Sequence, residues 1–182
     1  MLATKVIHAG DVRFDGNEQR YVLDCLQRGW ITMGQYVERF EAAFADFIGV
    51  KHAVATTNGT TALHLALTAL GIGEKDEVIV PTLSFIATAN AVTYTGATPV
   101  FCDSNPLDWN LYINQLEGLI TPRRKAIIPV HLYGYPCEMG FIRILAKRYN
   151  LLVIEDAAEA IGATYDGQMI GSLGDAGCFS FY

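Results

Sequence analysis

The sequence has 182 residues, of which 51% are hydrophobic and 18% charged, a balance that excludes a disordered chain and suffices for a domain with its own core. The net charge is −6 and the only cationic run is Arg123-Arg124-Lys125, so nucleic acid and anionic membranes are not expected as main partners. Neither a signal peptide nor an apolar run of ~20 residues is present, so we expect a cytoplasmic protein without a membrane span.

The first 50 residues are expected to form an arm followed by helices, ahead of a larger domain over residues 51–182. Helical spacing of apolar residues predicts one helix over 17–27 and a second over 36–47, each followed by a glycine. The second helix carries an aromatic stripe, for which core packing is the expected role. The stripe consists of Val37, Phe40, Phe44 and Phe47.

From His52 onward, short apolar runs alternate with helical segments. This pattern predicts an α/β fold with a mostly parallel sheet covered by helices on both faces. Strands are expected at 52–57, 77–80, 98–102, 126–130, 151–155 and 177–182, and helices at 60–70, 85–95, 112–120 and 138–149. In such sheets ligands bind at the carboxyl ends of the strands, so the chemistry is sought there.

The first such strand end is the segment 57–63, which passes into a helix. Gly59 allows a close turn, and Thr60 or Thr61 can cap the helix and donate a hydroxyl. The helix N-terminus attracts anions, so a phosphate site and a plain capped helix are equally good explanations. A P-loop is excluded because the Walker lysine is absent.

Three further strand ends carry polar or aromatic residues. Phe85 opens a helix, where core packing is the simpler role and stacking on a planar ring the functional one. Asp156 follows Glu155 at the end of an apolar strand, so one carboxylate needs a polar partner such as a protonated pyridine, with a metal or a helix cap as alternatives. Ser180 needs a phosphate or a backbone carbonyl. A holder for pyridoxal 5′-phosphate (PLP) explains all four strand ends together.

With these motifs the sequence resembles the DegT/DnrJ/EryC1/StrS family of PLP-dependent sugar-nucleotide aminotransferases. The resemblance rests on NGTTALHLAL (58–67), PTLSFIATANAV (81–92), IIPVHLYGYP (127–136), VIEDAAEAIGA (153–163) and GDAGCFSFY (174–182). It implies the large domain of the type I aminotransferase fold, truncated before the small C-terminal domain. It also implies a homodimer with shared active sites.

The resemblance also assigns roles to single residues. Gly59, Thr60, Thr61 and Ser180 would hold the phosphate, Phe85 would stack on the ring, Asp156 would pair with the ring nitrogen and Glu159 would contact the ring hydroxyl. His131, a candidate catalytic residue, and Tyr133 would lie near the site, where packing is an equally good role for either. Thr32 and Gly34, in a loop over 29–34, would help to shape the sugar-nucleotide pocket, unless that loop is only a helix–helix turn.

The implied activity is transfer of an amino group, from glutamate, to a 4-keto-6-deoxy sugar nucleotide in surface polysaccharide biosynthesis. The family's Schiff-base lysine would lie about three residues past Tyr182, so the 182-residue chain alone is expected to be inactive. A fragment of a longer enzyme, a natural truncation and a PLP-dependent sugar dehydratase with histidine at that position remain open. A non-catalytic homologue acting by interaction is the alternative from another class.

The four cysteines complete the sequence-based expectations. They lie too far apart for a CxxC motif, so we expect reduced, mostly buried thiols and neither a disulfide nor a metal site. They are Cys25, Cys102, Cys137 and Cys178.

Overall fold

A computed structural model describes residues 13–181, which form two compact units that divide between Phe40 and Glu41. The first unit contains helix α1 (Glu18–Arg28) and the beginning of α2 (Gln35–Ile48). α1 ends at Gly29, whose φ of 68° is the left-handed conformation that glycine adopts without strain. This end of the helix confirms the prediction, whereas the expected domain boundary after residue 50 stays a prediction.

The second unit contains the rest of α2 and all of the strands. Its remaining elements are α3 (Gly59–Ala69), β1 (Glu77–Pro81), α4 (Ala87–Tyr94), β2 (Thr98–Cys102), α5 (Ile113–Leu116), the 3-10 helix η1 (Glu117–Leu119), β3 (Arg124–Ile127), the 3-10 helix η2 (Leu132–Gly134), α6 (Met139–Tyr149), β4 (Leu152–Asp156), β5 (Thr164–Tyr165), β6 (Gln168–Met169) and β7 (Ala176–Cys178).

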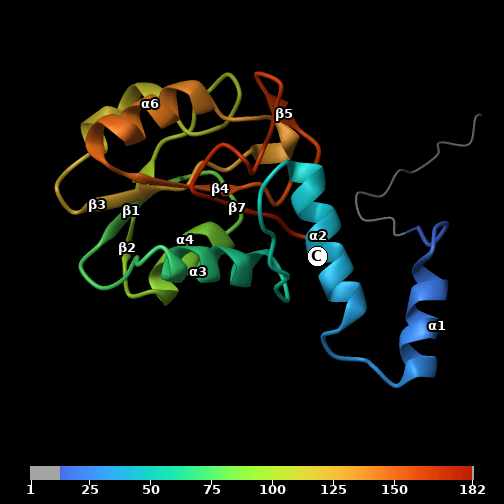
Figure 1. Cartoon of the computed structure of the whole chain (residues 1–182). Coiled ribbons are helices and arrows are strands. Elements are labelled where there is room, and N and C mark those ends of the chain that lie inside the picture. Colours follow the sequence, from blue (N-terminus) through green and yellow to red (C-terminus); the bar gives the residue numbers. More distant parts are fainter. Residues whose placement is uncertain (1–12, 182) are drawn as a thin grey trace, which may run out of the picture. The chain divides into compact units, whose positions relative to one another are not determined.

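Five strands form a sheet in the order β2-β1-β3-β4-β7, and every neighbouring pair is parallel. Helices α3 and α4 cover one face and α6 covers the other (Figure 1). Alternate side chains enter two cores: Val78 and Val80 pack with α3 and α4, whereas Ile79 packs with α6. The predicted parallel α/β fold, with both faces buried, is therefore confirmed.

The strand predicted over 52–57 is wrong. This segment belongs to no helix or strand, and most of its residues are exposed. Among residues 13–181 no strand pairs with it, and the Ala55 N–H instead donates to a Glu41 carboxylate oxygen at 2.8 Å. A β-strand needs a neighbour to take its backbone hydrogen bonds, and the local sequence pattern does not contain that information.

Other elements are shorter than predicted. The helix expected over 112–120 is a single turn, α5, followed by η1. The strand expected over 126–130 leaves the ladder after Ile127, because Pro129 has no N–H, and Val130 rejoins it through a bridge to Asp156. The strand expected over 177–182 ends at Cys178. A short antiparallel pair, β5 and β6, was not predicted.

The aromatic stripe of α2 is not the core element that its spacing predicts. Phe47 keeps 51% of its surface exposed and Phe40 keeps 40%, whereas the buried residues of this helix are Ala45 and Ile48. Phe44 packs edge-on against Phe179, with ring centroids 4.9 Å apart. A helix with a large apolar face therefore leaves part of that face open to solvent.

The cysteines and the lengths of the helices can be compared with the predictions. Cys102, Cys137 and Cys178 are buried free thiols, as expected, and Cys25 is partly exposed. Burial raises the pKa of Cys137 to about 12, so this thiol is inert near neutral pH. Within residues 13–181, the helices are too short or too polar to cross a lipid bilayer.

Candidate active site

A pocket of about 330 Å³ opens where β4 and β7 end beside the start of α3. Its lining unites six of the predicted site residues: Gly59, Thr60, Phe85, Asp156, Glu159 and Ser180. The other residues of the lining are Asn58, Leu63, Ala87, Val130, Leu132 and Ala158. Asp156, Glu159, Phe85 and Ser180 lie at or after the carboxyl ends of strands, as the parallel-sheet rule anticipates, whereas Gly59 and Thr60 reach the pocket from the start of α3 without a preceding strand.

The first turn of α3 forms one end of this pocket. Asn58 caps the helix, because its Oδ1 accepts from the Thr61 N–H at 3.0 Å and its own N–H donates to the Thr61 hydroxyl at 3.2 Å. Thr61 thus completes a capping box and does not line the pocket, so its phosphate role stays a prediction. The N–H groups of Gly59 and Thr60 belong to the first turn, where no intrahelical acceptor exists, and they suit an anion.

Gly59 lies directly against Ser180. A Cβ atom at position 59 would come within 2.9 Å of the Ser180 Cβ, closer than two such atoms approach in proteins. Glycine at this position therefore lets the helix N-terminus and the segment after β7 meet at one wall of the pocket.

We expect Gly59→Ala to weaken binding of an anionic ligand and to lower the free energy of unfolding by about 1–3 kcal/mol, because one wall must move. Thermal denaturation and ligand titration would measure both effects. Gly118→Ala is the matched control, since a Cβ there meets nothing within 4 Å. Equal behaviour of the two variants would contradict the proposed contact.

Asp156 ends β4 as a buried carboxylate, with 5% of its surface exposed. Its Oδ2 accepts from the Thr88 hydroxyl at 2.7 Å and its Oδ1 from the Ala158 N–H at 3.3 Å. Burial raises the pKa of Asp156, and these two hydrogen bonds only partly oppose that shift. A buried carboxylate without a cationic partner among the pocket residues is costly, so the site favours a cationic group on the ligand.

Thr88 holds the Asp156 carboxylate and was not among the predicted site residues. It is fully buried in α4, three residues after Phe85, and its N–H donates to the Phe85 carbonyl at 3.2 Å. A threonine inside an apolar helix face needs a hydrogen-bond acceptor, and that requirement was the signal available in the sequence. The same short segment therefore fixes the Asp156 carboxylate and presents Phe85, a residue that is 75% exposed and lines the pocket.

We expect Thr88→Val to raise the pKa of Asp156 further, because the hydroxyl that stabilises the carboxylate is lost. Binding of a cationic ring should then weaken, and its dependence on pH should shift toward higher pH. Ligand titrations across a pH series would measure the shift. Thr88→Ser keeps the hydroxyl and serves as the control, and a shift in both variants would contradict this role.

Glu159 lies on the pocket wall and holds a strained turn. Its Oε2 accepts from the Tyr133 N–H at 2.7 Å. Tyr133 has a φ of 52°, a left-handed conformation that is uncommon for residues other than glycine. Glu159 thus links the pocket to η2, and the sequence contained no local sign of this contact.

His131 does not line the pocket. It is fully buried, its Nδ1 accepts from the Cys137 N–H at 3.1 Å, and its Nε2 lies 3.2 Å from the Glu155 Oε2. Because Nδ1 is an acceptor, the proton sits on Nε2 and the ring is neutral. The packing role, rather than a direct catalytic one, therefore agrees with these contacts.

Glu155 is the second important residue whose role the sequence left open. Its carboxylate is fully buried and accepts from the backbone N–H groups of Gly171, Leu173 and Gly174 at 2.7–2.9 Å. Burial alone would raise its pKa, but the hydrogen bonds from His131, Gly171 and Gly174 outweigh burial and hold the pKa below its ordinary value. Glu155 therefore fastens the loop before β7, while its neighbour Asp156 faces the pocket.

Two predicted substrate residues belong to the first compact unit. Gly34 lines a separate pocket of about 410 Å³ next to Trp30, and Thr32 does not line it. Gly34 has a φ of 93°, and a Cβ there would clash with the Trp30 ring. A turn between α1 and α2 explains these features, and the sugar-nucleotide role of both residues stays a prediction.

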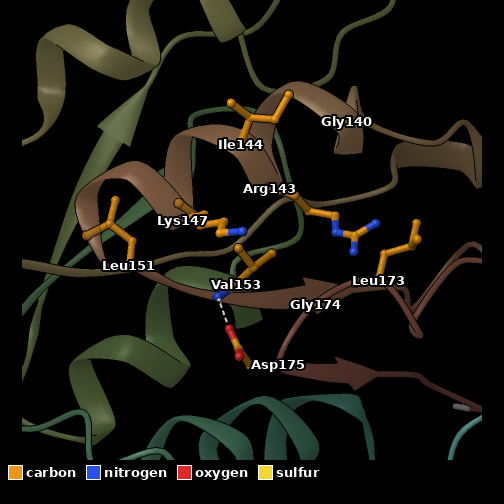
Figure 2. Close-up of a pocket in the computed structure, with 10 residues that line it drawn as sticks. Gly140, Arg143, Ile144, Lys147, Leu151, Val153, Leu173, Gly174 and Asp175 are labelled. Atoms are coloured by element: carbon orange, nitrogen blue, oxygen red, sulfur yellow. Dashed lines mark hydrogen bonds between the residues drawn. The ribbon is translucent and has the colours of Figure 1, made fainter.

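Another groove, of about 490 Å³, lies between α6, the beginning of β4 and the segment before β7 (Figure 2). Arg143 and Lys147 extend over it from α6, and Asp175 accepts from the Val153 N–H at 2.8 Å at its base (Figure 2). None of the predicted site residues lines this groove. Within residues 13–181, no group of three or more metal-ligating side chains converges at any point.

Known proteins resemble this chain along nearly its whole length. The profile of the DegT/DnrJ/EryC1/StrS aminotransferase family matches residues 13–182. A GDP-perosamine synthase of Caulobacter vibrioides is 62% identical over 171 residues, which are 93% of this chain and 46% of that protein.

Solved structures give the same result. The aminotransferase from Psychrobacter cryohalolentis has a TM-score of 0.89 and 43% identity, covering 93% of this chain and 43% of that one. The PLP-form of Spr1654 from Streptococcus pneumoniae has a TM-score of 0.86 and 33% identity, covering 91% of this chain and 46% of that one. The chain therefore spans about half the length of the relatives it matches.

Proposed function

Because the chain belongs to the DegT/DnrJ/EryC1/StrS aminotransferase family, we propose that the protein binds PLP and transfers an amino group to a keto-sugar nucleotide. The acceptor is a 4-keto-6-deoxyhexose linked to a nucleoside diphosphate, and the donor is an amino acid, glutamate. The product serves surface polysaccharide biosynthesis. The observation that carries the proposal is one pocket in which a helix N-terminus, an exposed aromatic ring and a buried carboxylate meet.

The residues of this pocket fit PLP by charge and shape. The first-turn N–H groups of α3 and the adjacent Ser180 suit the phosphate. The exposed ring of Phe85 suits stacking on the pyridine. Asp156, buried and without a cationic partner in the pocket, suits a protonated ring nitrogen.

When bound, PLP supplies an electron sink for the pair of electrons left when a proton leaves the amino-acid Cα. Asp156 would hold the proton on the ring nitrogen, and Thr88 fixes the carboxylate in place through its hydroxyl. Glu159, oriented by the Tyr133 N–H, faces the ring hydroxyl in this proposal. Phe85, which lines the pocket, would stack on the ring and exclude water from that face.

The amine that carries PLP and moves the Cα proton is assigned to a lysine outside the described residues. Within residues 13–181, no lysine lines the pocket. We therefore expect the 182-residue chain alone to bind PLP without forming a Schiff base or completing amino transfer. Borohydride reduction followed by mass measurement tests this, since a covalent adduct on the chain itself would contradict it.

The proposed activity is tested with the full-length natural protein. Incubation with PLP, glutamate and a panel of 4-keto-6-deoxy sugar nucleotides should release 2-oxoglutarate and form the amino sugar nucleotide, which mass spectrometry detects. Turnover with free amino-acid and keto-acid pairs, but with no sugar nucleotide, would overturn the substrate class. Absence of any PLP band in the full-length protein would overturn the cofactor.

A cytoplasmic homodimer belongs to the same proposal. The support for the homodimer is the exposed apolar surface of the first compact unit, where α1 has no buried residue. Large apolar side chains exposed there are Val22, Leu23, Leu26, Trp30, Ile31 and Met33. An exposed patch of this kind is typical of a protein interface. Light scattering of the full-length protein tests the dimer, and a monomer at micromolar concentration would contradict it.

A further inference from the structure

Two aromatic side chains, Trp109 and Tyr133, stay exposed beside the candidate active site. Trp109 keeps 55% of its surface exposed and Tyr133 keeps 74%. Their ring centroids are 6.5 Å apart, and the ring planes meet at 75°. Such exposure rules out core packing as the reason for this arrangement.

Both residues adopt left-handed backbone conformations, with φ values of 64° at Trp109 and 52° at Tyr133. Each such conformation in a bulky residue costs about 1–3 kcal/mol and persists only where the surroundings enforce it. Strain of this kind concentrates at ligand sites.

The buried side chain of Asn110 enforces the arrangement. Only 4% of Asn110 is exposed, its Nδ2 donates to the Tyr135 carbonyl at 3.0 Å, and its Oδ1 accepts from the Leu132 N–H at 3.2 Å. The Trp109 N–H donates to the Asn105 carbonyl at 2.8 Å. One amide therefore joins the loop that carries Trp109 to the turn that carries Tyr133, which preorganises the two rings.

The turn that carries Tyr133 borders the cofactor pocket. Leu132 and Glu159 line that pocket, and the Glu159 carboxylate holds the Tyr133 N–H at 2.7 Å. In the proposed reaction the keto carbon of the sugar must meet the cofactor inside the pocket. The nucleotide, attached at the other end of the sugar, must then extend beyond it.

We propose that Trp109 and Tyr133 form a stacking site for the base of the nucleotide-linked sugar, an inference that rests on the proposed function. The base stacks on the face of one ring and meets the other at its edge. A base stacked on an aromatic side chain gains about 1–3 kcal/mol, whichever base it is. Affinity for the nucleotide end of the substrate thus comes from this pair, at a distance from the reacting atoms.

The test uses the full-length holoenzyme and its Trp109→Ala, Trp109→Phe and Leu107→Ala variants. Leu107 is the matched control, because it lies in the same loop and is 91% exposed. Each protein is titrated calorimetrically with GDP, UDP and dTDP, and kcat and KM are measured with the keto-sugar nucleotide. Release of 2-oxoglutarate from glutamate alone, in a single turnover, reports the half of the reaction that needs no nucleotide.

We expect Trp109→Ala to raise the Kd of the nucleotide that the wild type binds, and the KM of the sugar nucleotide, by roughly 10-fold. Trp109→Phe should retain most of the affinity, and Leu107→Ala should match the wild type. The kcat, the PLP band and the single turnover with glutamate should remain unchanged, since these do not involve the base.

Several results would overturn the inference. They are an unchanged Kd in Trp109→Ala, a raised KM without a raised nucleotide Kd, an equal loss in Leu107→Ala, or no binding of any nucleotide to the wild type. A raised KM of the sugar nucleotide with an unchanged Kd of the nucleotide would indicate that the rings contact the sugar instead of the base. Absence of the single turnover with glutamate in the wild type would instead overturn the proposed function, so the two failures are distinguishable.

Discussion

Asp156→Asn should reduce amino transfer by the full-length protein by about 10²- to 10³-fold, the usual cost of removing one preorganised electrostatic contact in an active site. An amide does not keep the proton on the ring nitrogen, so the electron sink is lost while the side-chain shape is kept. Steady-state kinetics at saturating PLP would measure the loss. Asp46→Asn, on the exposed side of α2, is the control and should retain full activity.

The same substitution should stabilise the cofactor-free fold. Burial raises the folded-state pKa of Asp156 above its ordinary value of 3.8, so its ionisation opposes folding as the pH rises above that value. The amide that replaces the carboxylate carries no charge, and the variant should therefore melt a few degrees above the wild type at neutral pH. The difference should vanish below the ordinary value, where Asp156 is protonated in both states. A lower melting temperature for the variant at neutral pH would contradict the assigned pKa shift.

Glu155→Ala should have the opposite effect on stability and lower the free energy of unfolding by about 3–5 kcal/mol. The substitution leaves three backbone N–H groups and the His131 Nε2–H buried without an acceptor. A loss of this size is a large part of the ~5–15 kcal/mol that stabilises a typical domain. Chemical denaturation would measure it, with the exposed Glu74→Ala as the control that should stay within about 0.5 kcal/mol of the wild type.

The pH dependence of Glu155 has the sign usual for a stabilising carboxylate. Its folded-state pKa is below the ordinary value of 4.5, so its contribution is present above that value and is lost as the pH falls through the folded-state pKa. Wild type and Glu155→Ala should therefore converge in acid. A stability difference that does not shrink as the pH falls would mean that Glu155 acts through packing rather than charge.

The parallel sheet and its pocket could be predicted because they follow local rules. Continuous apolar runs separated by helical segments define a doubly covered sheet, and its strand ends must lie at one edge. Phe85 and Ser180 follow strands and Asp156 ends one, so their convergence needed no tertiary information. The two adjacent acids look alike in the sequence, and the resemblance assigned Asp156 to the cofactor; Asp156, and not Glu155, lines the pocket.

The parts that could not be predicted depend on distant partners. The segment 52–57 has the composition of a strand, yet among the described residues it has no neighbour to pair with. Thr88 contacts a residue 68 positions away, and Asn110 joins segments 22–25 positions away. His131 was placed near the site because of its sequence neighbours, whereas its ring turns into the core. Hydrophobic periodicity does not predict such long-range contacts.

Glu155 and Asp156 point to opposite faces of β4, so one-residue insertions and deletions just before this strand should be harmful. Successive side chains of a strand face opposite sides of the sheet, so gain of one codon between α6 and β4 would bring Glu155 to the pocket position and Ile154 to the position that binds the loop before β7. Loss of one codon would bring Asp156 to that loop and Ala157 to the pocket. Either change would leave an apolar side chain at one of the two positions that need a carboxylate. Insertions and deletions in this connection should therefore be tolerated far less well than substitutions.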